Sequence, residues 1–325
     1  MTITIDPVIN EPALLVSGDT KALVLADIHL GIEWDLYRSG FSIPSQIEQR
    51  LERIMRLVEQ ERPDRIVLLG DIKHNVPQVS WQERDEIPYF IGSLAEKAIV
   101  DIFPGNHDGG IEFLLPPDSD VNVYSARGDV IDGVGYFHGH TWPSVELLSA
   151  EHVIVAHNHP TVRFTDAMGY SVVEQVWIRA RLEREVLANH FKSADLSSES
   201  DIWSDPDVVV VPAFNELCGG VAFNESVRDD LLGPIFSSGA LDIDNSDIYL
   251  LDGTYLGILK NIRKLEETQS DRSRIRKSSK NRINKRKKDS RTSNPKETSR
   301  KNNTAKGNSK KSIITKGNTT KEDGK

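Results

Sequence analysis

Histidine, aspartate and asparagine residues gather in five short motifs in the first half of this 325-residue chain. Each motif follows a short apolar run, as expected where a buried strand ends at a polar site. Carboxylate, imidazole and amide donors without a thiolate suit Mn(II), Fe, Zn(II) or Mg(II) at a hydrolytic centre. The motifs are Asp27-Ile-His29, Gly70-Asp71, Gly105-Asn106-His107-Asp108, Phe137-His138-Gly139-His140 and Ala156-His157-Asn158-His159-Pro160.

Two motifs contain a pair of candidate ligands two residues apart. Asp27 and His29, like His157 and His159, are expected to converge, because alternate side chains of an extended chain share a face. Each motif alone is weak, since a Gly-Asp pair is mostly a turn and a single His is more often a core residue. Their joint occurrence behind successive predicted strands favours one shared site. The single cysteine, Cys218, leaves no internal disulfide and no cysteine-based zinc site.

The apolar pattern predicts alternating strands and helices before residue 104. Buried strands are expected at Lys21–Ala26, Arg65–Leu69 and Ala98–Phe103. An amphipathic helix begins near Pro44, and a second helix is expected to end within Ile91–Ala98. This order implies a parallel sheet with right-handed crossovers.

After residue 120 the pattern changes to short strands with little helix between them. We expect two facing sheets with helices outside, in one domain that covers residues 1–260, and short helices at Glu183–His190 and Val227–Leu232. The expected strands are 121–124, 129–131, 135–138, 152–156, 162–164, 171–178 and 207–211, and a hairpin of 247–251 and 254–259.

The net charge of −9 conceals two opposite parts. Residues 261–325 contain 22 basic and 7 acidic residues, a net charge of +15, whereas residues 1–260 contain 18 and 42, a net charge of −24. With so few large apolar residues, the basic, low-complexity tail is predicted to be disordered. It either binds nucleic acid electrostatically or is a solvated appendage. The chain has no apolar run of about 18 residues and no signal-peptide pattern, so we expect a cytoplasmic protein without a membrane partner.

The motif series DxH, GD, GNHD, HGH and HxH resembles that of the calcineurin-like metallophosphoesterases over most of residues 20–160. The stretches DIHLGIE, GDIKHN, FHGH, AHNHP and PAFNELCGG are similar to archaeal phosphoesterases related to the SbcD nuclease. The resemblance implies an α/β (α+β) four-layer αββα sandwich, with two metals at the carboxyl ends of the strands. It also implies phosphoester hydrolysis by a hydroxide that bridges the metals, and it is compatible with a homodimer.

The resemblance assigns two sets of metal ligands that share Asp71 as a bridge. Mn(II) is the favoured ion, with Fe, Zn(II) and Mg(II) as alternatives. One set is Asp27, His29, Asp71 and His159, and the other is Asp71, Asn106, His138 and His157.

Two further residues of the GNHD motif are expected to be catalytic. His107 would donate a proton to the leaving oxygen, and Asp108 would hold His107 and favour its charged form. The alternative for Asp108 is a turn cap.

Three positions remain open from sequence. His74 stands where the related GDxxD pattern has a second Asp, and it contacts the substrate phosphate with Lys73 or lies with it in an exposed loop. In HGH, His138 is preferred as the ligand because it ends a strand, and His140 is expected to support it. The PAFN stretch at 212–215 is expected to approach the metals from the second sheet.

Three functions are compatible with these residues. The first is a phosphodiesterase that acts on DNA or RNA as a nuclease. The second is a phosphodiesterase or phosphatase of nucleotides or small phosphoesters. The third is a nucleic-acid-binding protein with a structural metal site.

Overall fold

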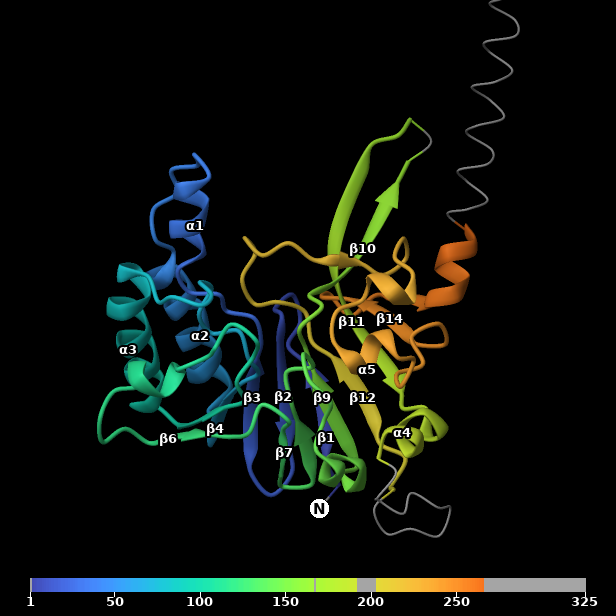
Figure 1. Ribbon diagram of the computed structural model, residues 1–325, viewed down its shortest axis with the longest axis horizontal. Coiled ribbons are helices and arrows are strands. Elements are labelled where there is room, and N and C mark those ends of the chain that lie inside the picture. Colours follow the sequence, from blue (N-terminus) through green and yellow to red (C-terminus); the bar gives the residue numbers. More distant parts are fainter. Residues whose placement is uncertain (1, 167, 192–202, 266–325) are drawn as a thin grey trace, which may run out of the picture. The chain divides into compact units, whose positions relative to one another are not determined.

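The computed structural model describes residues 2–166, 168–191 and 203–265. Two mixed β-sheets face each other, and helices lie on their outer sides (Figure 1). The expected α/β arrangement of two sheets flanked by helices is confirmed.

Six strands form the first sheet: β1 (Thr4–Pro7), β2 (Ala13–Ser17), β3 (Lys21–Leu25), β4 (Arg65–Leu68), β5 (Ile99–Ile102) and β6 (Val121–Val123). They follow one another in chain order across the sheet. From β3 to β5 the neighbours are parallel, as predicted, and β6 adds a further parallel strand that was not assigned to this sheet. The crossovers from β3 to β5 contain the helices α2 (Ile47–Glu61) and α3 (Trp81–Ala95). The antiparallel strands β1 and β2 were not predicted.

Nine strands form the second sheet: β7 (Asp129–Ile131), β8 (Val134–Tyr136), β9 (His152–Val155), β10 (Pro160–Thr165), β11 (Ser171–Arg181), β12 (Asp207–Val210), β13 (Val221–Ala222), β14 (Asp247–Leu250) and β15 (Tyr255–Ile258). Their order is β13-β10-β11-β12-β9-β8-β7, with β14 paired to β11 and β15 paired to β14. Strands β8, β9 and β12 are parallel, so their carboxyl ends lie at one edge.

Three apolar cores hold the layers together. The core between the sheets includes Val24, Val67, Trp177 and Val209. A second core packs α2 and α3 on the first sheet, and a third covers the outer face of the second sheet. Each fully buried side chain of this kind stabilises the fold by about 1.5–3 kcal/mol.

The smaller helical elements lie near the sheet edges: α1 (Ile32–Arg38), η1 (Ile111–Leu114), η2 (Val145–Ser149), α4 (Arg184–His190), η3 (Arg228–Asp230) and α5 (Pro234–Ser237). The helix expected at Glu183–His190 is confirmed as α4. The helix expected at Val227–Leu232 is wrong, because only the 3₁₀ turn η3 forms there. Of the three apolar residues in this segment only Leu231 is buried, and one buried side chain is too little to stabilise a longer helix.

Residues 259–265 are helical and belong to the same compact unit. Ile262 is buried, and Arg263 donates to the carbonyl oxygens of Phe223 and Ser226. The described domain therefore extends past residue 260. The rest of the predicted tail, residues 266–325, lies outside the described residues. Among the helices of the described part, none has the length and apolar character needed to cross a membrane.

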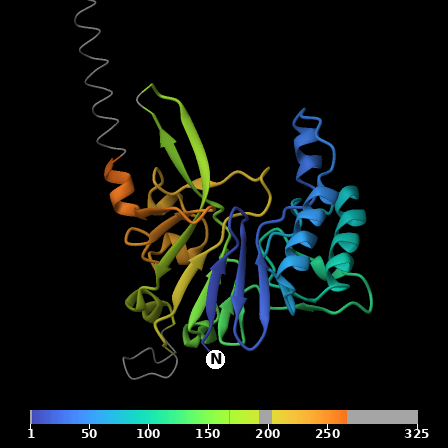
Figure 2. The same cartoon turned by 180° about the vertical axis from the view of Figure 1, so that it is seen from behind.

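Two projections flank the edge where the polar motifs meet. Helix α1 begins three residues after His29, and β10 begins directly after His159. Seen from either side, α1 and the β10–β11 hairpin rise from the same end of the sheets (Figures 1 and 2). Both projections thus start from loops that carry the predicted ligands.

Candidate metal centre

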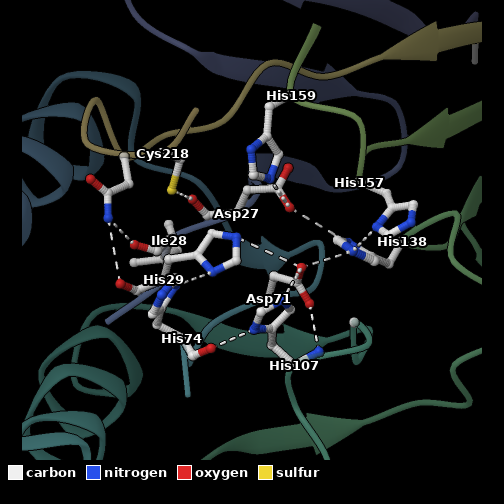
Figure 3. Close-up of polar contacts among 12 residues, drawn as sticks. Asp27, Ile28, His29, Asp71, His74, His107, His138, His157, His159 and Cys218 are labelled. Carbon is white, nitrogen blue, oxygen red and sulfur yellow. Dashed lines mark hydrogen bonds and ion pairs between the residues drawn. The ribbon is translucent and has the colours of Figure 1, made fainter. Parts of the chain in front are cut away.

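Asp71 lies at the centre of a cluster that joins loops from both sheets (Figure 3). Its Oδ2 is 3.3 Å from His138 Nε2 and 3.7 Å from His29 Nε2. Its Oδ1 accepts a hydrogen bond of 2.9 Å from the backbone N–H of His107. The loops after β3, β4, β5 and β8 therefore converge on one carboxylate.

Two groups with the geometry of metal ligands share this carboxylate. In Asp27–His29–Asp71 and in Asp71–His138–His157, one ligand atom of each residue lies within 4.8 Å of the others. His159 Nε2 is 3.2 Å from Asp27 Oδ1 and so joins the first group. We call Asp27, His29 and His159 the Asp27 side, and His138 and His157 the His138 side.

Asn106 is the predicted ligand that the structure leaves apart. Its side chain is exposed and makes no hydrogen bond to other described residues. Its chain neighbours Gly105 and His107 both lie against Asp71, so Asn106 is nevertheless at the edge of the cluster.

Five predicted ligands have left-handed backbone conformations. The φ angles are 54° at Asp27, 46° at His29, 49° at Asp71, 78° at His157 and 43° at His159. The paired side chains do meet, but the expected reason is wrong, because these residues are in left-handed and not in extended conformations. Each such residue costs about 1–2 kcal/mol, and strain of this kind clusters at functional sites.

Two glycines allow the loops to pack closely around the cluster. A Cβ at Gly70 would lie 2.3 Å from His138 Nδ1, and one at Gly105 would lie 2.1 Å from Asp71 Oδ1. Gly70 also has a φ of 77°, which glycine adopts without strain. Larger residues at these positions would displace the predicted ligands.

Buried polar atoms without partners indicate that this cluster fits a cation. Both carboxylate oxygens of Asp27 and the Nε2 of His29 are buried and make no hydrogen bond in the described part of the chain. A buried carboxylate without such bonds is strongly unfavourable unless a cation or a proton compensates it. Carboxylate and imidazole donors of this kind fit Mn(II), Fe, Zn(II) and Mg(II).

The histidine hydrogen bonds leave one ring nitrogen free to bind a metal. His138 donates from Nδ1 to the carbonyl oxygen of Leu69 at 3.0 Å, and His159 donates from Nδ1 to that of Gly219 at 2.7 Å. In both residues Nε2 then faces an aspartate of the cluster. Metal-binding histidines usually donate their other N–H in this way.

Burial and neighbouring charges shift the pKa values within the cluster. Burial lowers the pKa of His29 to about 3, and burial with the nearby His138 lowers the pKa of His157 to about 4. Burial opposes the charged form of Asp71, but His138 and His29 outweigh it and hold the pKa of Asp71 below its usual range. Burial also disfavours charged His138, yet Asp71 raises the pKa of His138 to about 9. Without a metal, the Asp71 carboxylate therefore lies beside a charged His138 and the neutral rings of His29 and His157, and a metal that binds His138 must displace its proton.

His107 lies beside the cluster with its ring fixed by the backbone. Its Nδ1 donates to the carbonyl oxygen of His74, and its Nε2 is 4.0 Å from Asp71 Oδ2. Its side chain is 26% exposed, so the ring is accessible from solvent.

The expectation that Asp108 holds His107 is wrong in this structure. Asp108 Oδ1 accepts from the backbone N–H groups of Ile72 and Lys73, and Oδ2 accepts from that of Gly105. Asp108 is fully buried, and its carboxylate joins the loops after β4 and β5. The alternative that we gave for Asp108, a turn cap, describes this arrangement better.

Lys73 and His74 do not form an exposed loop pair. Lys73 is 1% exposed, and its Nζ donates to the carbonyl oxygen of Asn75. His74 Nδ1 is 3.2 Å from His29 Nδ1, so His74 lies behind a predicted ligand.

The Nδ1 of His140 is buried without a hydrogen bond among the described residues, and its ring centre is 5.5 Å from that of His138.

The loop after β12 contributes residues to which the sequence assigned no chemistry. Asn215 is buried, donates to the carbonyl oxygen of Ile28 at 2.8 Å, and accepts from Arg50 at 3.0 Å. Arg50 also forms a buried ion pair of 2.7 Å with Glu33. The PAFN stretch does approach the cluster, and the loop also brings Cys218 close to it: one ligand atom each of His29, His159 and Cys218 lies within 4.8 Å of the others.

The chain is similar to known proteins in sequence and, more weakly, in structure. A family model described as calcineurin-like phosphoesterase matches residues 20–224. No curated protein matches the chain. The crystal structure of the Pseudomonas putida nuclease MPE is similar at 17% identity over 78% of this chain and 98% of that chain, with a TM-score of 0.41. Yfce, a phosphoesterase from E. coli, is similar at 17% identity over 45% of this chain and 73% of that chain, with a TM-score of 0.29.

Proposed function

Because the chain belongs to the calcineurin-like phosphoesterase family of phosphoester hydrolases, we propose that it is a metal-dependent phosphodiesterase that cleaves DNA or RNA as a nuclease. The observation that carries the proposal is the pair of ligand groups that share Asp71. A structural site needs only one closed set of ligands, whereas two sets joined by a carboxylate are typical of hydrolytic centres.

The two ions would be held on the two sides of Asp71. Two divalent cations, when bound, supply a nucleophile from water at neutral pH and offset the charge of the phosphoryl group. Asp71 would hold both ions, since its Oδ2 lies near His29 of one side and near His138 of the other. Asn106 would complete the second set with a neutral oxygen. The first set is Asp27, His29, Asp71 and His159, and the second is Asp71, Asn106, His138 and His157.

His107 would serve as the proton donor to the leaving oxygen. Its Nδ1 proton is held by the His74 carbonyl oxygen, so Nε2 is the atom that exchanges a proton. The His107 ring is accessible to solvent and lies beside the buried Asp71 carboxylate, so it can reach a bound phosphoester without binding a metal itself.

Exposed aromatic residues on the two projections support a nucleic-acid substrate. Trp34 on α1 is 40% exposed and stacks on Tyr37, with ring centres 5.7 Å apart. Tyr170, close to the tip of the β10–β11 hairpin, is 71% exposed. Such rings can stack on unpaired bases. The basic tail predicted from sequence would add electrostatic affinity for the phosphate backbone. The SbcD-like stretches of the sequence agree with this substrate class.

Hydrolysis of nucleotides or small phosphoesters is the second candidate. The net charge of −24 on residues 1–260 favours it, because an acidic surface repels a long polyanion. A small ester needs contact only with the metal centre.

The test is a set of hydrolysis assays with Mn(II). A chromogenic phosphodiester, a chromogenic monoester, and labelled single- and double-stranded nucleic acids would be offered to the full chain and to a chain that ends at residue 265. Nucleic-acid cleavage that weakens when the tail is removed supports the nuclease. Cleavage of small esters alone, unaffected by the tail, supports the second candidate. Absence of metal-dependent hydrolysis in every assay would leave a binding protein with a structural metal site.

A further inference from the structure

We propose that Cys218 is an additional ligand at the Asp27 side and makes that position prefer thiophilic metals such as Zn(II), Fe(II) and Co(II) over Mn(II) and Mg(II). The inference concerns which metal is bound, and it rests on the metal centre of the proposed function. The ligand set predicted from the sequence contains no thiolate.

The position of Cys218 carries the first step. One ligand atom each of His29, His159 and Cys218 lies within 4.8 Å of the others. In a zinc site with ordinary bond lengths, sulfur and nitrogen ligands are about 3.6 Å apart. The thiol therefore needs a side-chain shift of no more than about 1 Å to complete the site.

Two hydrogen bonds between side chains and backbone hold the loop of Cys218 against the Asp27 side. Before the cysteine, Asn215 donates to the carbonyl oxygen of Ile28, which lies between Asp27 and His29. After it, the carbonyl oxygen of Gly219 accepts from His159 Nδ1. The sulfur itself lies 4.0 Å from the carbonyl oxygen of Asp27 (Figure 3). Cys218 is thus held between the residues that would bind this metal.

Unpartnered buried atoms show independently that this side lacks a ligand. Both carboxylate oxygens of Asp27 and the Nε2 of His29 are buried without hydrogen bonds to other described residues. His29 belongs both to the group with Asp27 and Asp71 and to the group with His159 and Cys218, so a cation bound by His29 would lie next to the thiol.

The two sides then differ in whether they offer a soft sulfur donor to the metal. The His138 side has imidazole nitrogens and the shared carboxylate, and the chain contains no second cysteine. Thiolate ligands select Zn, Fe and Co, whereas oxygen and nitrogen donors also accept Mn(II) and Mg(II). On binding, the thiol proton passes to solvent and the sulfur donates an electron pair to the metal, and no group is oxidised.

The test uses cobalt, whose bond to a thiolate absorbs in the near ultraviolet. The full chain would be freed of metal, titrated with Co(II), and followed by absorption and by elemental analysis. The variants are C218S and C218A, and the control is E216Q, which changes an exposed residue of the same loop. The wild type and E216Q should show the thiolate band, and C218S and C218A should lose it while they still bind cobalt.

Two further measurements do not depend on the spectrum. With equal Mn(II) and Zn(II), C218S should lose preference for Zn(II) by about 10- to 100-fold, the usual loss when a group that supports a metal site is removed. Because Cys218 is the only cysteine, iodoacetamide labelling of the wild type reports on it alone, and Zn(II) should slow the labelling.

The outcomes separate this proposal from the proposed function. If two cobalt ions bind to the wild type without the band and without protection from labelling, Cys218 is not a ligand but the metal centre stands. If no cobalt binds to the wild type, both the ligand and the metal centre are overturned. Esterase activity decides the proposed function separately.

Discussion

The two sides of Asp71 differ in how well their polar atoms are satisfied without a metal. On the His138 side, His138 donates to the carbonyl oxygen of Leu69, and its Nε2 lies 3.1 Å from His157 Nδ1. On the Asp27 side, both oxygens of Asp27 and the Nε2 of His29 make no hydrogen bond to the described residues. A cation therefore relieves a larger penalty on the Asp27 side, and we expect that side to bind its metal more tightly.

The largest effect should come from the residue that both sides share. Asp71→Asn keeps the shape but removes the charge that holds two cations near each other, so both ions should be lost. We expect the turnover of a phosphodiester to fall by at least about 1,000-fold, which is the upper range for removal of one electrostatic stabiliser. Elemental analysis and the initial rate with Mn(II) check the prediction, and retention of two ions would contradict it.

A change at His107 should leave both sides intact. His107→Ala removes the proton donor but no metal ligand, so kcat should fall by about 100- to 10,000-fold with unchanged metal content. The loss should shrink for an ester whose leaving group is a weak base, because such a group needs no proton. An equal loss for good and poor leaving groups would argue against this role.

Much of this arrangement follows from the sequence because it depends on repeating patterns. The apolar spacing predicts α2, and the alternation of strands and helices predicts parallel strands β3 to β5. Once those strands are parallel, Asp27, Asp71 and His107 must follow neighbouring strand ends at one edge. The meeting of these three motifs was therefore predictable from the sequence.

The rest depends on contacts that leave no local pattern. Asn215 bonds to Ile28 across 187 residues of chain, and no spacing rule links them. The left-handed conformations at Asp27 and Asp71 are held by tertiary contacts against their local preference. A buried carboxylate such as Asp108 has the same sequence signature whether it accepts from an imidazole or from the backbone. A single cysteine gives no ligand spacing to recognise.

One matched pair of substitutions measures the difference between the sides directly. Asp27→Asn removes a charged ligand whose oxygens have no other hydrogen-bond partner, and His157→Gln removes a neutral one from the better satisfied side. We expect the first to weaken binding of one metal by about 100-fold and the second by about 10-fold. Calorimetric titration with Mn(II) gives both affinities. Equal losses would show that the hydrogen bonds made by the ligand atoms in the metal-free protein do not control the affinity for the metal.

The smallest effect should come from the residue that braces both loops without facing either ion. Asp108→Asn leaves an amide that can accept from Ile72 and Lys73 but cannot accept from the N–H of Gly105 with its other end. One buried N–H is then unpaired, so the free energy of unfolding should fall by about 1–3 kcal/mol. Urea titration of the metal-free protein measures this loss. If Asp108 controlled the proton of His107 instead, the variant would change the pH dependence of kcat. Because the backbone carbonyl of His74 holds that ring, we expect the pH profile to stay the same while stability falls.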